Sequence, residues 1–93
     1  MEKRNNIWEK LVKYATLRPR SEKEVRDWFR KKKVNQAIRG ELTQKLRNLG
    51  FLDDKKFALW WIEQRVEFRP RSTKELYREL YQKGVSREII KKA

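Results

Sequence analysis

Apolar side chains recur along the first half of the chain at the three- and four-residue spacing of amphipathic helices. The pattern predicts helices over residues 6–15, 22–33 and 36–49. Pro19 separates the first two, because the residue before a proline avoids the helical region. Ser21 then starts the second helix as its N-cap. The predicted core positions are Ile7, Trp8, Leu11, Tyr14, Ala15, Val25, Trp28, Phe29, Ile38, Leu42, Leu46 and Leu49.

The second half shows the same alternation of helices and caps. One helix is predicted after Asp53, one from Ser72 to Gly84, and one after Ser86 that ends at Ala93. Asn35 is the corresponding cap in the first half, and Gly50 and Gly84 stand where left-handed C-caps belong. The expected core, which opens with a hydrophobic staple of Leu52 and Phe57, comprises Leu52, Phe57, Ala58, Trp61, Ile62, Val66, Leu76, Leu80, Ile89 and Ile90.

An internal repeat explains this similarity. The motif Arg-Pro-Arg-Ser at residues 18–21 recurs at residues 69–72, and each copy leads into a Ser-x-x-Glu capping box. A repeat of this length is one supersecondary unit used twice. We therefore expect an all-α fold of tandem three-helix, helix-turn-helix-like modules over residues 1–50 and 51–93. The last helix is much shorter than its counterpart, so the second module is expected to be truncated.

The net charge narrows the range of partners. The chain has 26 basic and 13 acidic residues, a net charge of +13. Such an excess implies a polyanionic partner, such as nucleic acid or an acidic protein surface. Residues 1–50 carry net +9 of this charge and residues 51–93 net +4. The first module should therefore dominate any electrostatic contact.

Several functional classes are excluded by what the chain lacks. It contains no His and no Cys, and it has no glycine-rich phosphate loop, so we expect neither an enzyme nor a cofactor, metal or small-molecule substrate. Asp53 and Asp54 are explained as a helix N-cap and a dipole-favoured first-turn acid. The polar N-terminus leads into no signal-peptide core, and no apolar run is long enough to span a membrane. These features favour a cytoplasmic protein without a membrane partner.

The second predicted helix carries a row of cations. Lys23, Arg26, Arg30 and Lys33 follow one another at helical spacing on the side opposite Val25 and Phe29, and Lys31 adds to their density. We interpret the row as a binding face; the alternative is a solvated helix surface.

The two Arg-Pro-Arg-Ser loops each place two guanidinium groups beside a helix N-terminus, which suits phosphate or carboxylate. The arginines are candidates for anion binding, and the alternative is a linker whose serine only caps. The four residues concerned are Arg18, Arg20, Arg69 and Arg71.

Aromatic side chains are candidates for stacking on nucleic-acid bases. Trp60 lies beside its apolar stripe and is the best exposed candidate, whereas the other three tryptophans fall on core positions. Tyr77 and Tyr81 stand where the first module has Arg26 and Arg30. The alternative for these tyrosines is that they cover a seam between the modules.

Two segments carry a resemblance to a known family. Residues 18–25, continuing to 32–34, resemble the opening of the first repeat of the RecX regulatory proteins. Residues 52–58, with Arg65 further on, resemble the signature at the start of that family's second repeat. The resemblance covers nearly the whole chain from Trp8 onward. Family members usually carry three repeats and a glycine-rich loop where this chain has 68–71.

The resemblance implies a modulator of the recombinase RecA. Such a protein lies in the helical groove of the RecA filament on single-stranded DNA and modulates recombination and repair, with inhibition the expected direction. The implied partners are the filament and single-stranded DNA of any sequence, and Arg65 is expected among the contacts.

Two rival functions remain. In the first, a DNA-binding three-helix protein without a RecA partner inserts residues 36–49 into the major groove. That helix carries few cations (Arg39, Lys45 and Arg47), and Gly40 in its middle costs about 1 kcal/mol relative to alanine. In the second, the chain is a scaffold that binds an acidic protein.

Overall fold

The computed structural model describes residues 4–68 and 72–92, and within them every regular element is helical. The expected all-α fold of three-helix units is therefore confirmed. None of these helices is both long and apolar enough to cross a membrane. The elements are α1 (Arg4–Leu17), α2 (Glu22–Lys31), α3 (Gln36–Asn48), α4 (Asp54–Phe68), α5 (Thr73–Gln82) and α6 (Arg87–Lys92).

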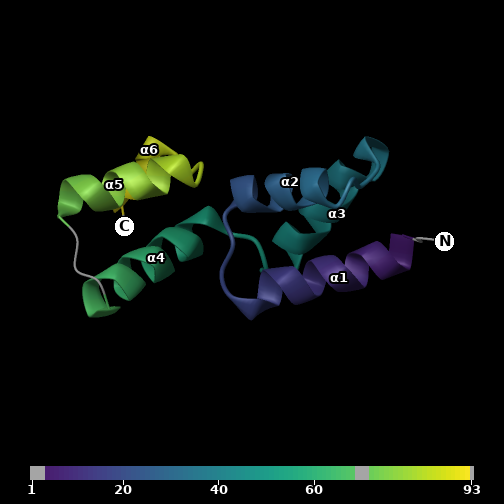
Figure 1. Cartoon of the computed structure of the whole chain (residues 1–93), viewed down its shortest axis with the longest axis horizontal. Coiled ribbons are helices and arrows are strands. Elements are labelled where there is room, and N and C mark those ends of the chain that lie inside the picture. The colour runs from purple at the N-terminus through teal and green to yellow at the C-terminus, as the bar shows by residue number, and fades with distance from the viewer. Residues whose placement is uncertain (1–3, 69–71, 93) are drawn as a thin grey trace.

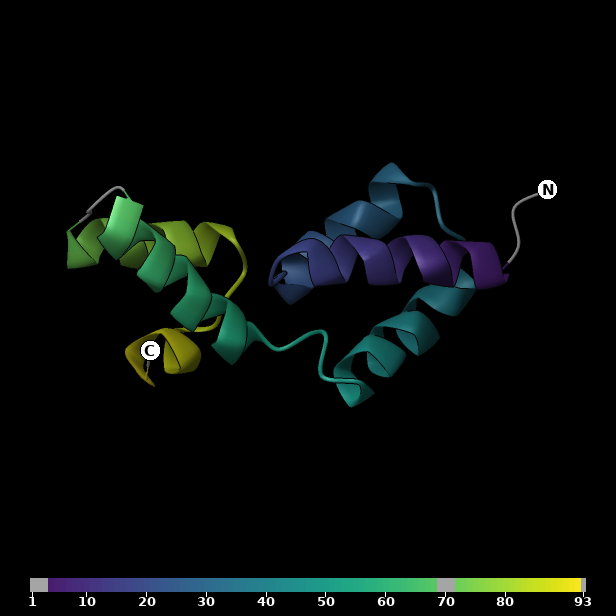
Figure 2. The ribbon, with the colours of Figure 1, turned by 90° about the horizontal axis from the view of Figure 1, so that it is seen from below.

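The two three-helix units lie one after the other along the longest axis of a molecule measuring 47 × 24 × 23 Å. Figure 1 shows α2 and α5 following each other along one edge, with α1 and α4 on the opposite edge. Figure 2 shows the extended link between α3 and α4 that joins the units. The division into residues 1–50 and 51–93 stays a prediction, and Leu52 packs into the first core.

The predicted N-caps form as expected. Ser21 accepts a hydrogen bond from the N–H of Glu24, whose carboxylate accepts one from the N–H of Ser21 in return. Ser72 and Glu75 form the same reciprocal pair at α5. These capping boxes satisfy amide donors that a helix start leaves without partners.

The backbone conformation at the helix C-termini explains why α2 ends earlier than expected. Gly50 and Gly84 have φ of 79° and 82°, the left-handed conformation that glycine adopts without steric cost. Lys33 has φ of 55° at the position equivalent to Gly84. The turn at Lys33 lets the N–H of Val34 donate to the carbonyl of Phe29 at 3.0 Å. As a result α2 ends at Lys31 and not at Lys33.

Each unit has its own hydrophobic core. The first contains Leu11, Ala15, Val25, Trp28, Phe29, Val34, Leu42, Leu46 and Leu52. The second contains Phe57, Ala58, Leu80, Val85 and Ile90.

Three core predictions are wrong. The staple does not form, because Leu52 and Phe57 belong to different cores. Leu49, just past the end of α3, and Val66, in the last turn of α4, are 54% and 62% exposed. Among the described residues α6 has six residues and α3 has 13.

Candidate nucleic-acid interface

The outer side of α2 is a basic surface. Val25, Trp28 and Phe29 are buried on the inner side of the helix, so the cations between them face solvent. Arg30 is widely exposed, with 75% of its side chain accessible. We call this surface the α2 basic face; its exposed members are Lys23, Arg26, Arg30, Lys31 and Lys33, with Lys33 just past the helix end.

The basic face includes one acid at its centre. Asp27 pairs with Lys23 at 3.2 Å and with Arg30 at 3.2 Å. Such exposed i, i+3 and i, i+4 pairs contribute only a few tenths of a kcal/mol, about 0.3–0.5. Because these pairs are weak, Lys23 and Arg30 can exchange Asp27 for a stronger anionic partner.

Packing of α2 against α3 adds arginines that sequence reasoning did not include in the site. Arg39 and Arg47 of α3 line a groove together with Arg26 and Arg30 of α2. Glu22 is the acid of this groove, and it accepts hydrogen bonds from Arg47 at 2.7 and 2.8 Å. These bonds lower the pKa of Glu22 against the opposing effect of burial. The i, i+8 spacing of Arg39 and Arg47 shows that they share a face, but only helix packing brings that face to α2.

The cations of α3 have partners within the molecule. Arg39 donates to the carbonyl of Val34 at 2.9 Å, Lys45 lies 4.5 Å from the centre of the Trp8 ring, and Arg47 binds Glu22. A recognition helix needs side chains available to reach base edges. These contacts argue against α3 as a major-groove reader.

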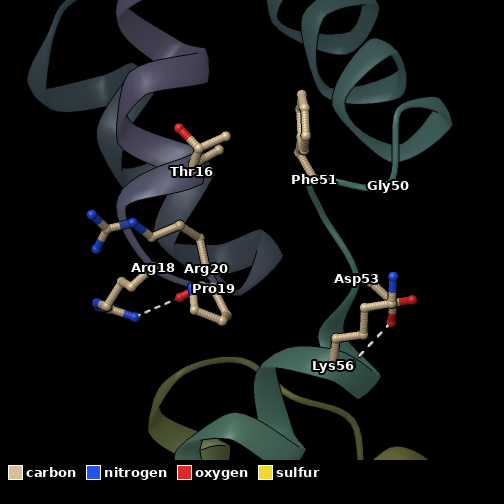
Figure 3. A pocket seen from close by; sticks show the side chains of 9 residues that line it. Thr16, Arg18, Pro19, Arg20, Gly50, Phe51, Asp53 and Lys56 are labelled. Carbon is tan, nitrogen blue, oxygen red and sulfur yellow. Dashed lines mark hydrogen bonds between the residues drawn. The ribbon is translucent and has the colours of Figure 1, made fainter.

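The first Arg-Pro-Arg-Ser loop uses its arginines to hold the fold. Arg18 donates to the Glu24 carboxylate and to the carbonyl of Pro19, both at 2.7 Å. Arg20 donates to the carbonyl of Tyr14 at 2.8 Å and lies 3.8 Å from the centre of its ring. In Figure 3 both guanidinium groups point away from Asp53 and Lys56, which lie across the hollow between the units. The loop therefore offers fewer donors to an external anion than its sequence suggests.

Glu24 connects the two units. Its carboxylate binds Arg18 and the N–H of Ser21, and it accepts a hydrogen bond from Lys83 of the second unit at 3.3 Å. Burial opposes ionisation of Glu24, but the hydrogen bonds from Arg18 and Ser21 outweigh it and hold its pKa below the ordinary value. Beside this cluster, Lys23 packs against Gly84 so closely that an added Cβ would lie 2.6 Å from the Lys23 Cβ.

The acidic pair has structural partners. Asp53 caps α4 by accepting from the N–H of Lys55 at 2.9 Å. Asp54 accepts from the N–H of Glu22 at 2.8 Å and so caps the start of α2 from the other unit. Burial raises the pKa of Asp54, partly offset by this hydrogen bond. Among the described residues no group of three or more His, Cys, Asp or Glu side chains could hold a metal ion.

Arg65 also has intramolecular partners. It pairs with Glu79 at 3.1 Å and lies 4.6 Å from the centre of the Trp61 ring. Trp61 donates to the same carboxylate at 2.8 Å. The remaining candidates, Arg69 and Arg71, lie outside the described residues.

The structure answers two questions about aromatic residues that the sequence left open. Trp60 is partly buried against the second core, with the Arg18 guanidinium 5.1 Å from its ring centre, so it is not an exposed platform. Tyr77 and Tyr81 do not cover a seam between the units, because they are 40% and 47% exposed. Sequence position alone did not show which of these aromatic side chains are buried, since a residue at the edge of an apolar stripe can face either the core or the solvent.

Comparison with known proteins finds RecX relatives. Residues 53–93 match the family model for RecX, second three-helix domain. The chain is 33% identical to the regulatory protein RecX of Listeria monocytogenes over 81 residues, which cover 87% of this chain and 30% of that protein. The resemblance to the RecX family is confirmed.

Two further RecX proteins match the chain in the same way. The regulatory protein RecX of Oceanobacillus iheyensis is 32% identical over 82 residues (88% of this chain, 30% of that protein). That of Bacillus velezensis is 34% identical over 82 residues (88% of this chain, 31% of that protein). The chain thus spans about 30% of the length of the RecX relatives it matches. No solved structure matches it.

Proposed function

We propose that this chain is a regulator, without enzymatic activity of its own, that binds the RecA filament on single-stranded DNA in the cytoplasm and modulates recombination and repair, with inhibition the expected direction. The RecX resemblance supplies the partner. The observation that carries the contact is the α2 basic face, where Arg26, Arg30 and Lys31 of α2 are exposed together with Lys33 just past its end.

The chemistry of the face suits a polyanion of any sequence. Cations attract phosphates and displace their counterions, a contribution that does not depend on base identity. The groove beside the face adds the guanidinium groups of Arg39 and Arg47, which already hydrogen-bond inside the molecule and so contribute less than the exposed cations of the face. Arg18, Arg20 and Arg65 should contribute less, because they already hydrogen-bond inside the molecule.

The proposal is tested with the chain, RecA and a labelled single strand. RecA is assembled on the strand with a slowly hydrolysed ATP analogue, and binding of the chain is followed by sedimentation at several salt concentrations. RecA ATPase is measured in parallel with ATP. We expect binding to the filament that weakens by orders of magnitude from low to moderate salt, together with a changed ATPase rate.

The controls separate the rivals. Binding to bare DNA with no binding to the filament and no effect on ATPase would favour a DNA-binding protein without a RecA partner. Binding to RecA alone, independent of DNA, would favour a protein scaffold. Absence of any binding at low salt would contradict the electrostatic argument itself.

A further inference from the structure

The outer side of α5 combines aromatic rings with cations. Lys74, Tyr77, Arg78, Tyr81 and Gln82 line one shallow surface, and all five are exposed. These positions are neighbours on a helix of 3.6 residues per turn. We call this surface the α5 aromatic face.

Acids of the same helix are directed elsewhere. Glu75 is part of the capping box with Ser72. Glu79 faces α4, where it binds Trp61 and Arg65. The aromatic face therefore carries two cations and no acid among the five residues that line it.

The repeat offers a direct comparison with the first unit. The same five positions in α2 are Lys23, Arg26, Asp27, Arg30 and Lys31. Tyrosines in α5 replace the two arginines, and Arg78 replaces the one acid. A surface that can hold phosphates in the first unit thus becomes a surface of rings flanked by cations in the second.

The rings are positioned to receive planar groups. Tyr77 and Tyr81 are one helical turn apart, a rise of about 6 Å. Arg87 donates to the Tyr81 hydroxyl at 3.1 Å, which restrains that ring. Neither tyrosine belongs to a hydrophobic core. Exposed aromatic rings beside cations are typical of surfaces that stack the bases of single strands.

We propose that the α5 aromatic face stacks the bases of single-stranded DNA, while the α2 basic face binds phosphates of the same strand. The two helices follow each other along one edge of the molecule (Figure 1), and the Lys83–Glu24 contact joins their facing ends. A duplex hides the flat sides of its bases, so this face favours single strands. Lys74 and Arg78 favour a polyanion over an apolar protein surface as the occupant. The inference deepens the proposed function but is tested without RecA.

The test measures binding of the chain to three fluorescein-labelled probes by anisotropy at one low salt concentration. The probes are an oligothymidine strand of about 20 nucleotides, an abasic strand of equal length, and a duplex. The double variant Tyr77→Ala/Tyr81→Ala should bind oligothymidine about tenfold or more weakly, since stacking on each base is lost. Its affinity for the abasic strand should stay the same.

Two variants complete the design. Tyr77→Phe/Tyr81→Phe retains the rings and should retain binding to oligothymidine. Leu59→Ala/Val66→Ala removes exposed apolar side chains from α4 and should leave all three affinities unchanged. Circular dichroism checks that each variant keeps its helices.

The outcomes that overturn the inference are distinct from failure of the proposed function. Equal affinity of the unchanged chain for oligothymidine and the abasic strand would remove the stacking argument. The stacking argument would also fail if the alanine variant lost affinity for oligothymidine and the abasic strand equally, or lost affinity for neither. If the alanine variant lost binding to RecA but kept its binding to oligothymidine, the α5 aromatic face would be assigned to a protein partner. By contrast, normal stacking with no effect on RecA would leave the inference standing and refute the proposed function.

Discussion

Lys33 and Gly84 occupy the same position in the two modules, and both have the left-handed backbone conformation, with φ of 55° and 82°. Glycine adopts this conformation freely, whereas an L-residue with a side chain loses about 1–2 kcal/mol in it. The first module therefore tolerates at Lys33 a strain that the second module avoids.

Replacing Lys33 by glycine should relieve this strain. Glycine also loses more backbone entropy on folding, so we expect Lys33→Gly to stabilise the chain by at most about 1 kcal/mol. Thermal or urea unfolding measures the change. Lys32→Gly is the matched control, because Lys32 has φ of −85° and gains nothing from glycine. If both variants lose stability, backbone strain at Lys33 does not limit the stability of the first module.

Gly84 should be less tolerant of alanine than Gly50. Both have positive φ, but a Cβ at Gly50 meets open space, while one at Gly84 would lie 2.6 Å from the Lys23 Cβ. Gly50→Ala should cost about 1–2 kcal/mol from backbone strain alone. Gly84→Ala should cost more, because the contact between the modules must also shift. Comparable losses in urea unfolding would show that the modules separate at little cost.

Acid should weaken the chain through Glu24. Its pKa is lowered in the folded state, so its contribution is present above the unfolded pKa of about 4.3 and is lost as pH falls through the folded pKa. The melting temperature should therefore drop below about pH 4.3, and less steeply in Glu24→Gln. Asp54 has the opposite sign because its pKa is raised. Asp54→Asn should accordingly make the drop steeper, and a shallower drop would contradict this assignment.

Charge reversal on the α2 basic face should weaken filament binding without unfolding the chain. Arg26→Glu/Arg30→Glu/Lys33→Glu changes exposed side chains, which contribute mainly to long-range attraction. We expect helical content to stay and filament affinity to fall at least about tenfold.

The matched control for this variant is Lys55→Glu/Lys91→Glu/Lys92→Glu, which reverses the same number of exposed cations on α4 and α6. Anisotropy of a labelled filament at one salt concentration compares the two. If both triple variants lose affinity equally, the net charge of the chain determines its attraction to the filament, and the α2 basic face has no special role.

Core truncations should be severe in either module. Leu46 and Phe57 are fully buried in separate cores, and large-to-small changes at such sites cost about 2–5 kcal/mol. A small domain has little stability in reserve, so Leu46→Ala and Phe57→Ala should each abolish or nearly abolish the thermal transition. Leu49→Ala, at an exposed position just past α3, should change stability by less than about 0.5 kcal/mol. A near-normal melt for Leu46→Ala or Phe57→Ala would refute the core assignment.

The sequence by itself determined the helices, their caps and the repeat, because these depend on residues within a few positions of one another. Ser21 with Glu24 and Ser72 with Glu75 meet within one turn, and the apolar spacing marks which side of each helix is buried. Only the tertiary structure decided which cations remain available for a partner. Arg18 and Arg20 had the right type and loop for anion binding, yet packing brought them to Glu24 and Tyr14. The outcome rests on side chains meeting across helices and across modules, as when Asp54 reaches Glu22 and Lys83 reaches Glu24. Such contacts produce no periodic pattern in the sequence, since they depend on how whole helices pack and not on local spacing.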